Sequence, residues 1–336
     1  MNEKAWFIVL AVLVLQFNPF SVMVAAEAKG IKVVATISAM ASIIGPVLST
    51  NDNLTVLLPS NVEPHSFTLD PVTVKSALEA DILVSSGHIG WEKAIEDQIK
   101  SAGKAVFDPV EDLDSLVLYE SPSGGVNLHG YWLDPENVKM IATEFSRLAS
   151  AMNPTASGEY ERNLRKYVSE IDALKSFSSN SVKGRGVYGS NVVIGFFEEQ
   201  YVVKSFGMNV VGVLAGDEEE VGISPQKLEE IRRGLLNGTI NYLVVSDIAL
   251  ELPLNEYIKN LSHETGSEVI YVRTLDVTGV YDFRALYLYN LGNVVGSNHP
   301  SEEDHYLLAP DVYLVVIAVS VALNMMLLYI LFRKVR

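Results

Sequence analysis

The chain has 336 residues, a formal net charge of -16 at pH 7 and a hydrophobic content of 49%. This length is enough for two ordinary domains, and a charged fraction of 20% is typical of globular rather than disordered proteins. The acidic balance argues against nucleic acid as a partner, because phosphate binding requires clustered lysine and arginine side chains. Cysteine is absent, which excludes disulfides, thiolate metal ligands and a lipid-carrying N-terminal cysteine. Any metal site must therefore use histidine and oxygen donors.

Both ends of the sequence predict an association with a membrane. Residues 1–26 have the pattern of a secretory signal peptide, with an apolar core and small residues before the expected cleavage point. Residues 312–332 are apolar and long enough to cross a bilayer as a helix, after a juxtamembrane stretch at 299–311. By the positive-inside rule the tail 333–336 is cytoplasmic, since it carries Arg333, Lys334 and Arg336. We therefore expect a single-pass protein of the plasma membrane whose main part lies outside the cytoplasm.

Between these ends, apolar runs alternate with segments of helical pattern. The runs typical of buried strands are 31–37, 53–59, 81–87, 104–110, 191–197, 209–214, 240–247 and 268–276. In the second half, helices are expected near 198–206, 225–236, 254–265 and 281–295. Three dipeptides place a capping residue before a proline at the first helical position, namely Asp70-Pro71, Asp134-Pro135 and Ser224-Pro225. The alternation predicts an α/β fold with mostly parallel sheets and helices on both faces.

A long polar segment divides this pattern into two halves. Residues 153–180 carry apolar side chains at roughly helical spacing, which predicts one long connecting helix. The stretch 178–186 is rich in Ser and Gly and is expected to be a loop. We therefore expect an N-terminal α/β lobe at 27–152 and a C-terminal α/β lobe at 181–298, joined by this helix.

Several metal-binding side chains follow predicted strands, at the ends where open α/β sheets bind ligands. They are His65, His129, the adjacent Glu198 and Glu199, and Asp276. Two imidazoles with two carboxylates suit a four-coordinate site for Zn²⁺ or Mn²⁺. Each residue alone has an ordinary alternative role, such as a solvated loop or a helix N-terminus, so their shared position carries the prediction. His88 is expected to begin a helix rather than to bind metal, and His263 is expected on a helix surface.

Two motifs place a histidine among distinctive neighbours, VEPHSFTLDP and LHGYWLDPEN. Three weaker stretches accompany them: IKVVATISAMASIIGPV, YVVKSFGMNVVGV followed by EEEVGISPQKLEEI, and SHETGSEVIYVRTLD. Together they resemble the zinc- and manganese-binding solute-binding proteins of ABC transporters, the family that includes the TroA- and ZnuA-like proteins. The resemblance covers roughly residues 31–297.

This resemblance implies two α/β lobes joined by a rigid helix, with a metal ion bound in the cleft between them. It implies a binding protein without catalytic activity, expected to be a monomer, that delivers the ion to an ABC permease driven by a cytoplasmic ATPase. His65, His129 and Asp276 stand at the family's ligand positions. The family's third ligand falls on Phe196. Either Glu198 or Glu199 binds after a local shift in register, or water completes a three-residue site, or the site is impaired.

Two other functions stay open at the level of sequence. A metal-dependent extracellular hydrolase needs an open coordination position and a general base, which a three-ligand site beside Glu198 or Glu199 could supply. No HExxH motif is present in the sequence to favour it. The other alternative is a surface adhesin with a relic metal site.

Overall fold

The computed structural model describes residues 29–58, 62, 64–65, 67–121, 124–215, 224–246, 253–274 and 282–296. The chain divides into two compact units. Unit 1 comprises the residues up to 116 together with 136–171 and 276–283. Unit 2 comprises 117–135, 172–275 and the residues from 284 onward. Each unit contains a four-stranded parallel sheet, so the predicted α/β class is confirmed.

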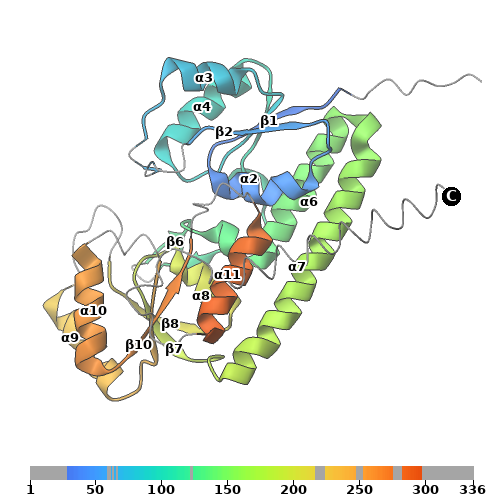
Figure 1. Ribbon diagram of the computed structural model, residues 1–336. Coiled ribbons are helices and arrows are strands. Elements are labelled where there is room, and N and C mark those ends of the chain that lie inside the picture. The colour runs from blue at the N-terminus through green and yellow to red at the C-terminus, as the bar shows by residue number, and fades with distance from the viewer. Residues whose placement is uncertain are drawn as a thin grey trace, which may run out of the picture. The chain divides into compact units, whose positions relative to one another are not determined.

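The sheet of unit 1 has the strand order β2-β1-β3-β4. Its strands are β1 (Lys32–Ala35), β2 (Asn53–Val56), β3 (Ile82–Val84) and β4 (Ala105–Phe107). The helices around it are α2 (Ser38–Ile44), α3 (Pro71–Leu78), α4 (Gly90–Ser101) and α5 (Pro109–Asp112). Figure 1 shows α3 and α4 on one face of this sheet and α2 on the other. This topology brings the carboxyl ends of β1 and β3 together, at the edge where ligands bind in such folds.

Apolar side chains hold α3 and α4 on the sheet of unit 1. One buried cluster contains Val34, Leu57, Ala77, Ala80, Leu83, Ile95 and Ile99. The start of α3 is as predicted, because the Asp70 carboxylate accepts a hydrogen bond from Thr73 N at 2.7 Å and Pro71 opens the helix. Asp70 and Pro71 therefore determine where this helix begins, while the buried apolar contacts determine where it lies on the sheet.

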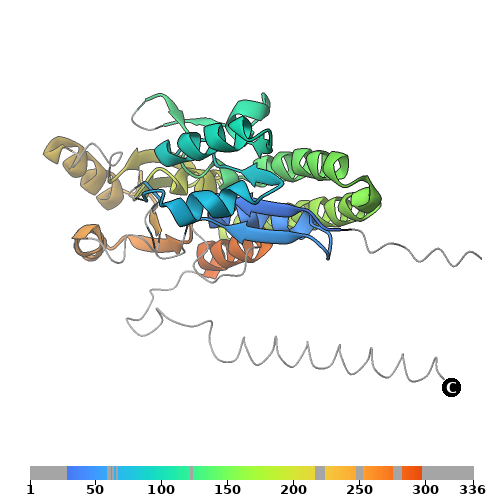
Figure 2. The same cartoon turned by 90° about the horizontal axis from the view of Figure 1, so that it is seen from above.

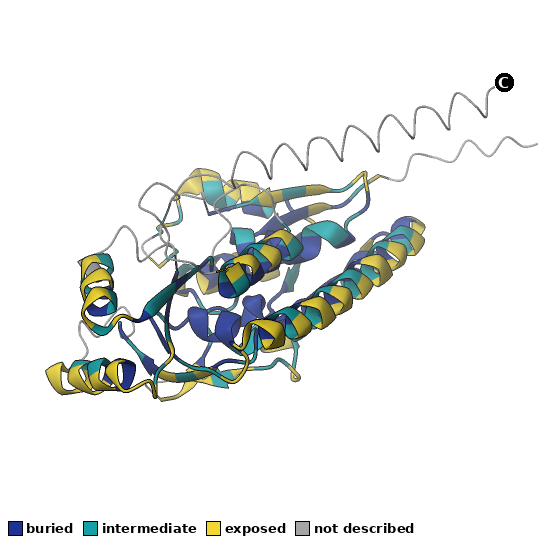
Figure 3. Ribbon diagram, turned by 60° about the horizontal axis from the view of Figure 1, so that its bottom comes forward, coloured by how far each residue is buried: buried dark blue, intermediate teal, exposed yellow. Residues whose placement is uncertain are grey.

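The helices α6 (Pro135–Met152) and α7 (Ser157–Arg185) follow, and Figures 1 and 2 both draw α6 beside the first half of α7. Figure 3 colours the outer side of α7 largely yellow, as expected for a helix with one buried stripe. The loop predicted at 178–186 is wrong, because α7 continues to Arg185. Ser178 Oγ lies 2.7 Å from the hydroxyl of Tyr287, and Val182 is fully buried. Packing within unit 2 thus overrides the weak helix propensity of this stretch.

The sheet of unit 2 has the order β10-β9-β7-β8. Its strands are β7 (Asn191–Ile194), β8 (Asn209–Val213), β9 (Tyr242–Ser246) and β10 (Glu268–Val272). The helices are α8 (Glu199–Ser205), α9 (Pro225–Leu236), α10 (Pro253–Thr265) and α11 (Phe283–Gly296). Figure 1 shows α9 and α10 on one side of this sheet and α8 and α11 on the other. Read in chain order, the strands of unit 2 have the same arrangement as those of unit 1.

A hairpin of unit 2 lies in the connection between α5 and α6. Its strands are β5 (Tyr119–Glu120) and β6 (Val126–Asn127), and a 3-10 turn follows at Tyr131–Leu133. The hairpin was not predicted, because each strand has only two residues. It delivers His129 to unit 2.

The two predicted membrane-related segments, 1–26 and 312–332, lie outside the described residues. In the part of the chain that the structure describes, no helix combines the length and the apolar character needed to cross a membrane.

Candidate metal centre

His65 lies in unit 1, in the connection between β2 and α3, and its side chain is exposed. The start of α4 anchors this connection, because Trp91 Nε1 donates a hydrogen bond to the carbonyl of Pro64 at 2.9 Å. The ring of Phe67 packs edge-on against Trp91 with centroids 5.1 Å apart. His65 is thus held between two anchored neighbours, with an imidazole open to solvent.

His88 also lies in unit 1, just beyond the end of β3. The prediction that His88 begins a helix is wrong, since α4 begins at Gly90 and Ile89 is its N-cap residue. Its ring makes an edge contact with His65, with centroids 5.6 Å apart and planes at 74°. His88 Nδ1 lies 2.8 Å from Ser86 Oγ. Two imidazoles therefore meet at the carboxyl ends of the strands of unit 1, and one of them was missed at the level of sequence.

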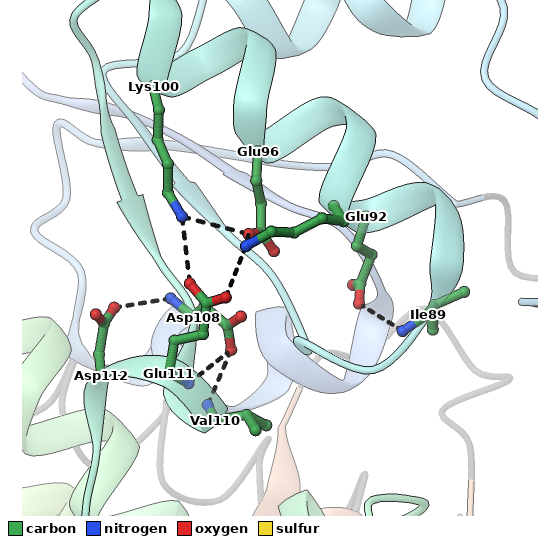
Figure 4. A network of polar contacts seen from close by, with 9 residues as sticks. Ile89, Glu92, Glu96, Lys100, Asp108, Val110, Glu111 and Asp112 are labelled. Atoms are coloured by element: carbon green, nitrogen blue, oxygen red, sulfur yellow. Dashed lines mark hydrogen bonds and ion pairs between the residues drawn. The ribbon is translucent and has the colours of Figure 1, made fainter.

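A buried carboxylate supports this pair. Glu92 is 1% exposed, and it accepts hydrogen bonds from Ser86 N at 2.9 Å and from Ser86 Oγ at 2.7 Å. It also accepts from Ile89 N at 3.2 Å, a bond drawn in Figure 4, and from Thr36 Oγ1. Because Thr36 follows β1 and Ser86 follows β3, Glu92 ties together the ends of the two central strands.

His129 lies in unit 2, directly after β6. Its backbone N–H donates to Asn127 Oδ1 at 2.9 Å, and Asn127 is 2% exposed. Asn127 Nδ2 in turn donates to the carbonyl of Phe197 at 2.9 Å and to Gln200 Oε1 at 2.8 Å. The turn that carries His129 is therefore fastened to the start of α8.

Gly130 explains how closely this turn approaches α8. Its φ of 90° lies in the left-handed region, which favours glycine. A Cβ at this position would lie 2.9 Å from both Cα and the carbonyl oxygen of Glu198. A larger residue would therefore displace the turn, and His129 with it.

The carboxylates predicted after β7 differ in their surroundings. Glu199 is fully buried and accepts hydrogen bonds from Gly195 N at 2.5 Å, from Phe196 N at 3.0 Å and from Ser246 N. Burial raises the pKa of the Glu199 carboxyl to about 8, against the opposing effect of the hydrogen bonds from the backbone of Phe196 and Ser246. Both Glu199 oxygens are thus engaged with the sheet, whereas Glu198 is only half-buried.

The remaining predicted positions add no observed donor. Phe196 is half-buried and packs against the apolar cluster of the unit 2 sheet. Asp276 lies outside the described residues. The members of the predicted ligand set that the structure describes are His65, His129, Glu198 and Glu199, and Glu199 accepts hydrogen bonds from the backbone.

A separate acidic group in unit 1 contains Glu96, Asp108 and Glu111 (Figure 4). Glu111 accepts a hydrogen bond from Lys93 at 2.6 Å and forms an ion pair with Lys100 at 3.4 Å. Asp108 caps α5 through bonds from Val110 N at 2.9 Å and Glu111 N at 3.3 Å. Burial, and next the charge of Glu96, raise the pKa of Asp108 to about 6. Lys93 and Lys100 form ion pairs with Glu96 and Glu111, and Asp108 caps a helix, so the group is a structural network.

The sequence matches the family described as ZnuA, zinc-uptake complex component A, periplasmic, over residues 33–295. A manganese ABC transporter substrate-binding lipoprotein, PsaA of Streptococcus mitis, is 25% identical over 248 residues, 72% of this chain and 79% of the relative. The fold is similar to AdcAII of Streptococcus pneumoniae, with a TM-score of 0.66 and 19% identity, covering 81% of this chain and 100% of that one. It is also similar to FpvC of Pseudomonas aeruginosa solved with Mn²⁺, with a TM-score of 0.64 and 17% identity, covering 80% and 98% of the two chains.

These comparisons correct the predicted localisation. The relatives from Streptococcus mitis and Streptococcus pneumoniae are lipoproteins, which contradicts a single-pass protein with a cytoplasmic C-terminus. The prediction relied on the length and apolar character of 312–332 and on the basic residues after it, and such a pattern does not by itself establish a spanning helix. Membrane anchoring through Arg333, Lys334 and Arg336 is therefore not supported.

The family match covers most of the chain, and the parallel-sheet fold agrees with it. The chain belongs to the ZnuA family of zinc-uptake components, the metal-binding substrate-binding proteins of ABC transporters, and is a transport protein rather than an enzyme.

Proposed function

We propose that this protein captures one divalent transition-metal ion, Zn²⁺ or Mn²⁺, and delivers it to an ABC permease driven by a cytoplasmic ATPase. The observation that carries the proposal is that His65 and His129 both lie on anchored segments that follow strands. Imidazole nitrogens are among the preferred donors for Zn²⁺, and added carboxylates extend the preference toward Mn²⁺. The metal-binding relatives support the same chemistry.

The proposed ligands include His65 from unit 1 and His129 from unit 2, with Asp276 as a carboxylate donor. Glu198 or Glu199 was predicted to complete the set. The bonds that Glu199 makes to the backbone favour Glu198 of the two. In this proposal the units act as two lobes joined by α7.

The two alternatives receive no support from particular residues. A hydrolase would need a general base beside an open coordination position, and the family contains transport proteins. An adhesin with a relic site would not need the support that Asn127 and Glu92 give to the histidine segments.

Metal analysis of the full-length protein tests the proposal. The chelator-treated protein should bind one Zn²⁺ or Mn²⁺ per chain in calorimetry, and both His65→Ala and His129→Ala should lose it. His263→Ala is the matched control, because His263 is exposed on α10. A wild-type protein without stoichiometric metal, or with binding that survives both substitutions, would contradict metal capture at this site.

A further inference from the structure

The half-buried His88 lies beside a hydroxyl that is itself bonded to a buried carboxylate. We infer that His88 supplies the fourth protein donor of the metal site through Nε2, in place of a residue after β7. The inference rests on the proposed function and pairs His88 with His65, so that two imidazoles of unit 1 bind the ion. Such a donor set favours Zn²⁺ more than a site with two carboxylates does.

The first step is position. His65 and His88 belong to the same unit, and their rings are in edge contact with centroids 5.6 Å apart. Two imidazoles in a tetrahedral zinc site each place a nitrogen about 2.0–2.1 Å from the ion. Neighbouring rings at this separation can turn one nitrogen each toward a common point without a change in the backbone.

The second step is the protonation of His88. The Ser86 hydroxyl has one proton, and it donates this proton to the buried carboxylate of Glu92 at 2.7 Å. Ser86 Oγ is therefore an acceptor toward His88 Nδ1, 2.8 Å away, so Nδ1 carries the ring proton. The neutral ring then has its lone pair on Nε2, which is the form that binds a metal ion.

The third step is the supporting shell. Ligating histidines usually donate their other N–H to a carboxylate, a carbonyl or water, which fixes the ring and raises its basicity. In this protein Glu92 acts on His88 through Ser86, and Glu92 is itself fixed by the backbone N–H groups of Ser86 and Ile89. The carboxylate that stabilises the strand ends thus also fixes the hydroxyl that faces His88.

The fourth step is the lack of an equivalent donor after β7. Phe196 has no donor atom in its side chain, and both oxygens of Glu199 accept bonds from the sheet. Glu198 is half-buried, and its backbone packs closely against the turn at Gly130. His88 thus offers an imidazole donor that a buried acid orients through Ser86.

The test uses the full-length, chelator-treated protein with Zn²⁺ in competition titrations and with Co²⁺ as a spectroscopic probe of coordination. His88→Ala should weaken Zn²⁺ binding by at least ~100-fold and reduce the visible Co²⁺ absorption typical of a tetrahedral site. Ser86→Ala should weaken binding by ~10-fold while the Co²⁺ spectrum keeps its shape, since supporting residues contribute ~10–100-fold. His263→Ala should bind within about twofold of the wild type, because it removes no proposed ligand.

The thermal unfolding midpoint of each metal-free variant shows whether a loss of binding comes from a lost ligand or from unfolding. If His88→Ala does not fold, Ser86→Ala still tests the inference, because this variant retains the His88 side chain. Wild-type binding that is lost in His65→Ala and His129→Ala but unchanged in His88→Ala would overturn this inference and leave the proposed function intact. Loss of binding in Glu198→Gln with retention in His88→Ala would place the fourth donor after β7. A wild-type protein that binds no Zn²⁺ or Co²⁺ would overturn both.

Discussion

The two units have the same strand arrangement, and in each a buried glutamate accepts hydrogen bonds at the strand ends. The two glutamates differ in what else they contact. In unit 1 the buried Glu92 joins the ends of β1 and β3, and in unit 2 the buried Glu199 joins the ends of β7 and β9. These are equivalent strand pairs, but the glutamates come from different helices, α4 and α8. Among the described residues, the carboxylate of unit 1 also bonds a serine hydroxyl that contacts an imidazole, and that of unit 2 does not.

This comparison shows how a stabilising residue can become part of a binding site. Glu199 satisfies backbone N–H groups where two strands end, which a buried sheet edge requires. Glu92 does the same and, through Ser86, also orients His88. The contact of Ser86 with His88 therefore distinguishes Glu92, which supports the proposed metal ligand, from Glu199, which has a structural role.

The largest expected effect is on stability. Glu92→Ala and Glu199→Ala should each lower the free energy of unfolding by about 2–4 kcal/mol, because several buried donors lose their acceptor. Only Glu92→Ala should also weaken Zn²⁺ binding, by ~10–100-fold. Urea denaturation and zinc titration measure the two quantities, with the exposed Glu79→Ala as control. If both variants changed the zinc affinity equally, the proposed difference in function between Glu92 and Glu199 would be contradicted.

Gly130 tests the support of His129 in unit 2. Gly130→Ala should destabilise the protein by about 2–3 kcal/mol, since the left-handed φ and the close contact with Glu198 both oppose a side chain. Gly238→Ala is the matched control: its φ is 75° and no atom lies within 4 Å of the added Cβ, so about 1 kcal/mol is expected. Zinc affinity should fall in Gly130→Ala and stay unchanged in Gly238→Ala. The same small loss of stability in both variants would show that the turn is not fixed by α8.

The raised pKa of Asp108 should make the stability of unit 1 depend on pH. Its pKa is raised to about 6, so the folded state binds more protons than the unfolded chain between about pH 4 and 6. Stability should therefore fall as pH rises through this window, by the order of 1–2 kcal/mol after solvent screening. Asp108→Asn keeps the oxygen that caps Val110 and should remove this part of the slope in urea titrations. A variant with the wild-type slope would assign the dependence to another group.

The smallest effect is spectroscopic and compares the two described tryptophans. Trp91 in unit 1 bonds to Pro64, next to His65, whereas Trp132 in unit 2 is buried against Tyr131. Zinc should change tryptophan fluorescence, and Trp91→Phe should lose most of this change while Trp132→Phe keeps most of it. The opposite pattern would place the larger metal-linked rearrangement in unit 2.

Much of the fold could be predicted from the sequence because its signals are local. Apolar runs gave the eight strands of the two sheets, and the capping dipeptides at Asp70 and Ser224 start helices as expected. The extension of α7 through 178–185 was missed, since it depends on contacts such as that of Ser178 with Tyr287. The hairpin at 119–127 was missed because its strands are too short to show a period.

The site was predicted less completely. His65 and His129 were identified from their motifs, whereas His88 was set aside although it too follows a strand. The signal that could have found it is its position after β3, by the same rule that selected the other two. The relay from Glu92 through Ser86 could not be predicted, because it depends on the turn that folds residues 86–92 back on themselves. The engagement of Glu199 with the strand ends likewise depends on the pairing of β7 with β9.

We propose that imidazoles of this protein, those of His65 and His129 among them, hold a metal ion. Zinc titration of the full-length, chelator-treated protein, alongside His65→Ala and His129→Ala, tests it most directly. The account predicts one Zn²⁺ per wild-type chain and a loss of at least ~100-fold in affinity in each variant, since each loses a direct ligand. Stoichiometric binding that survives both substitutions, or no binding by the wild type, would contradict it.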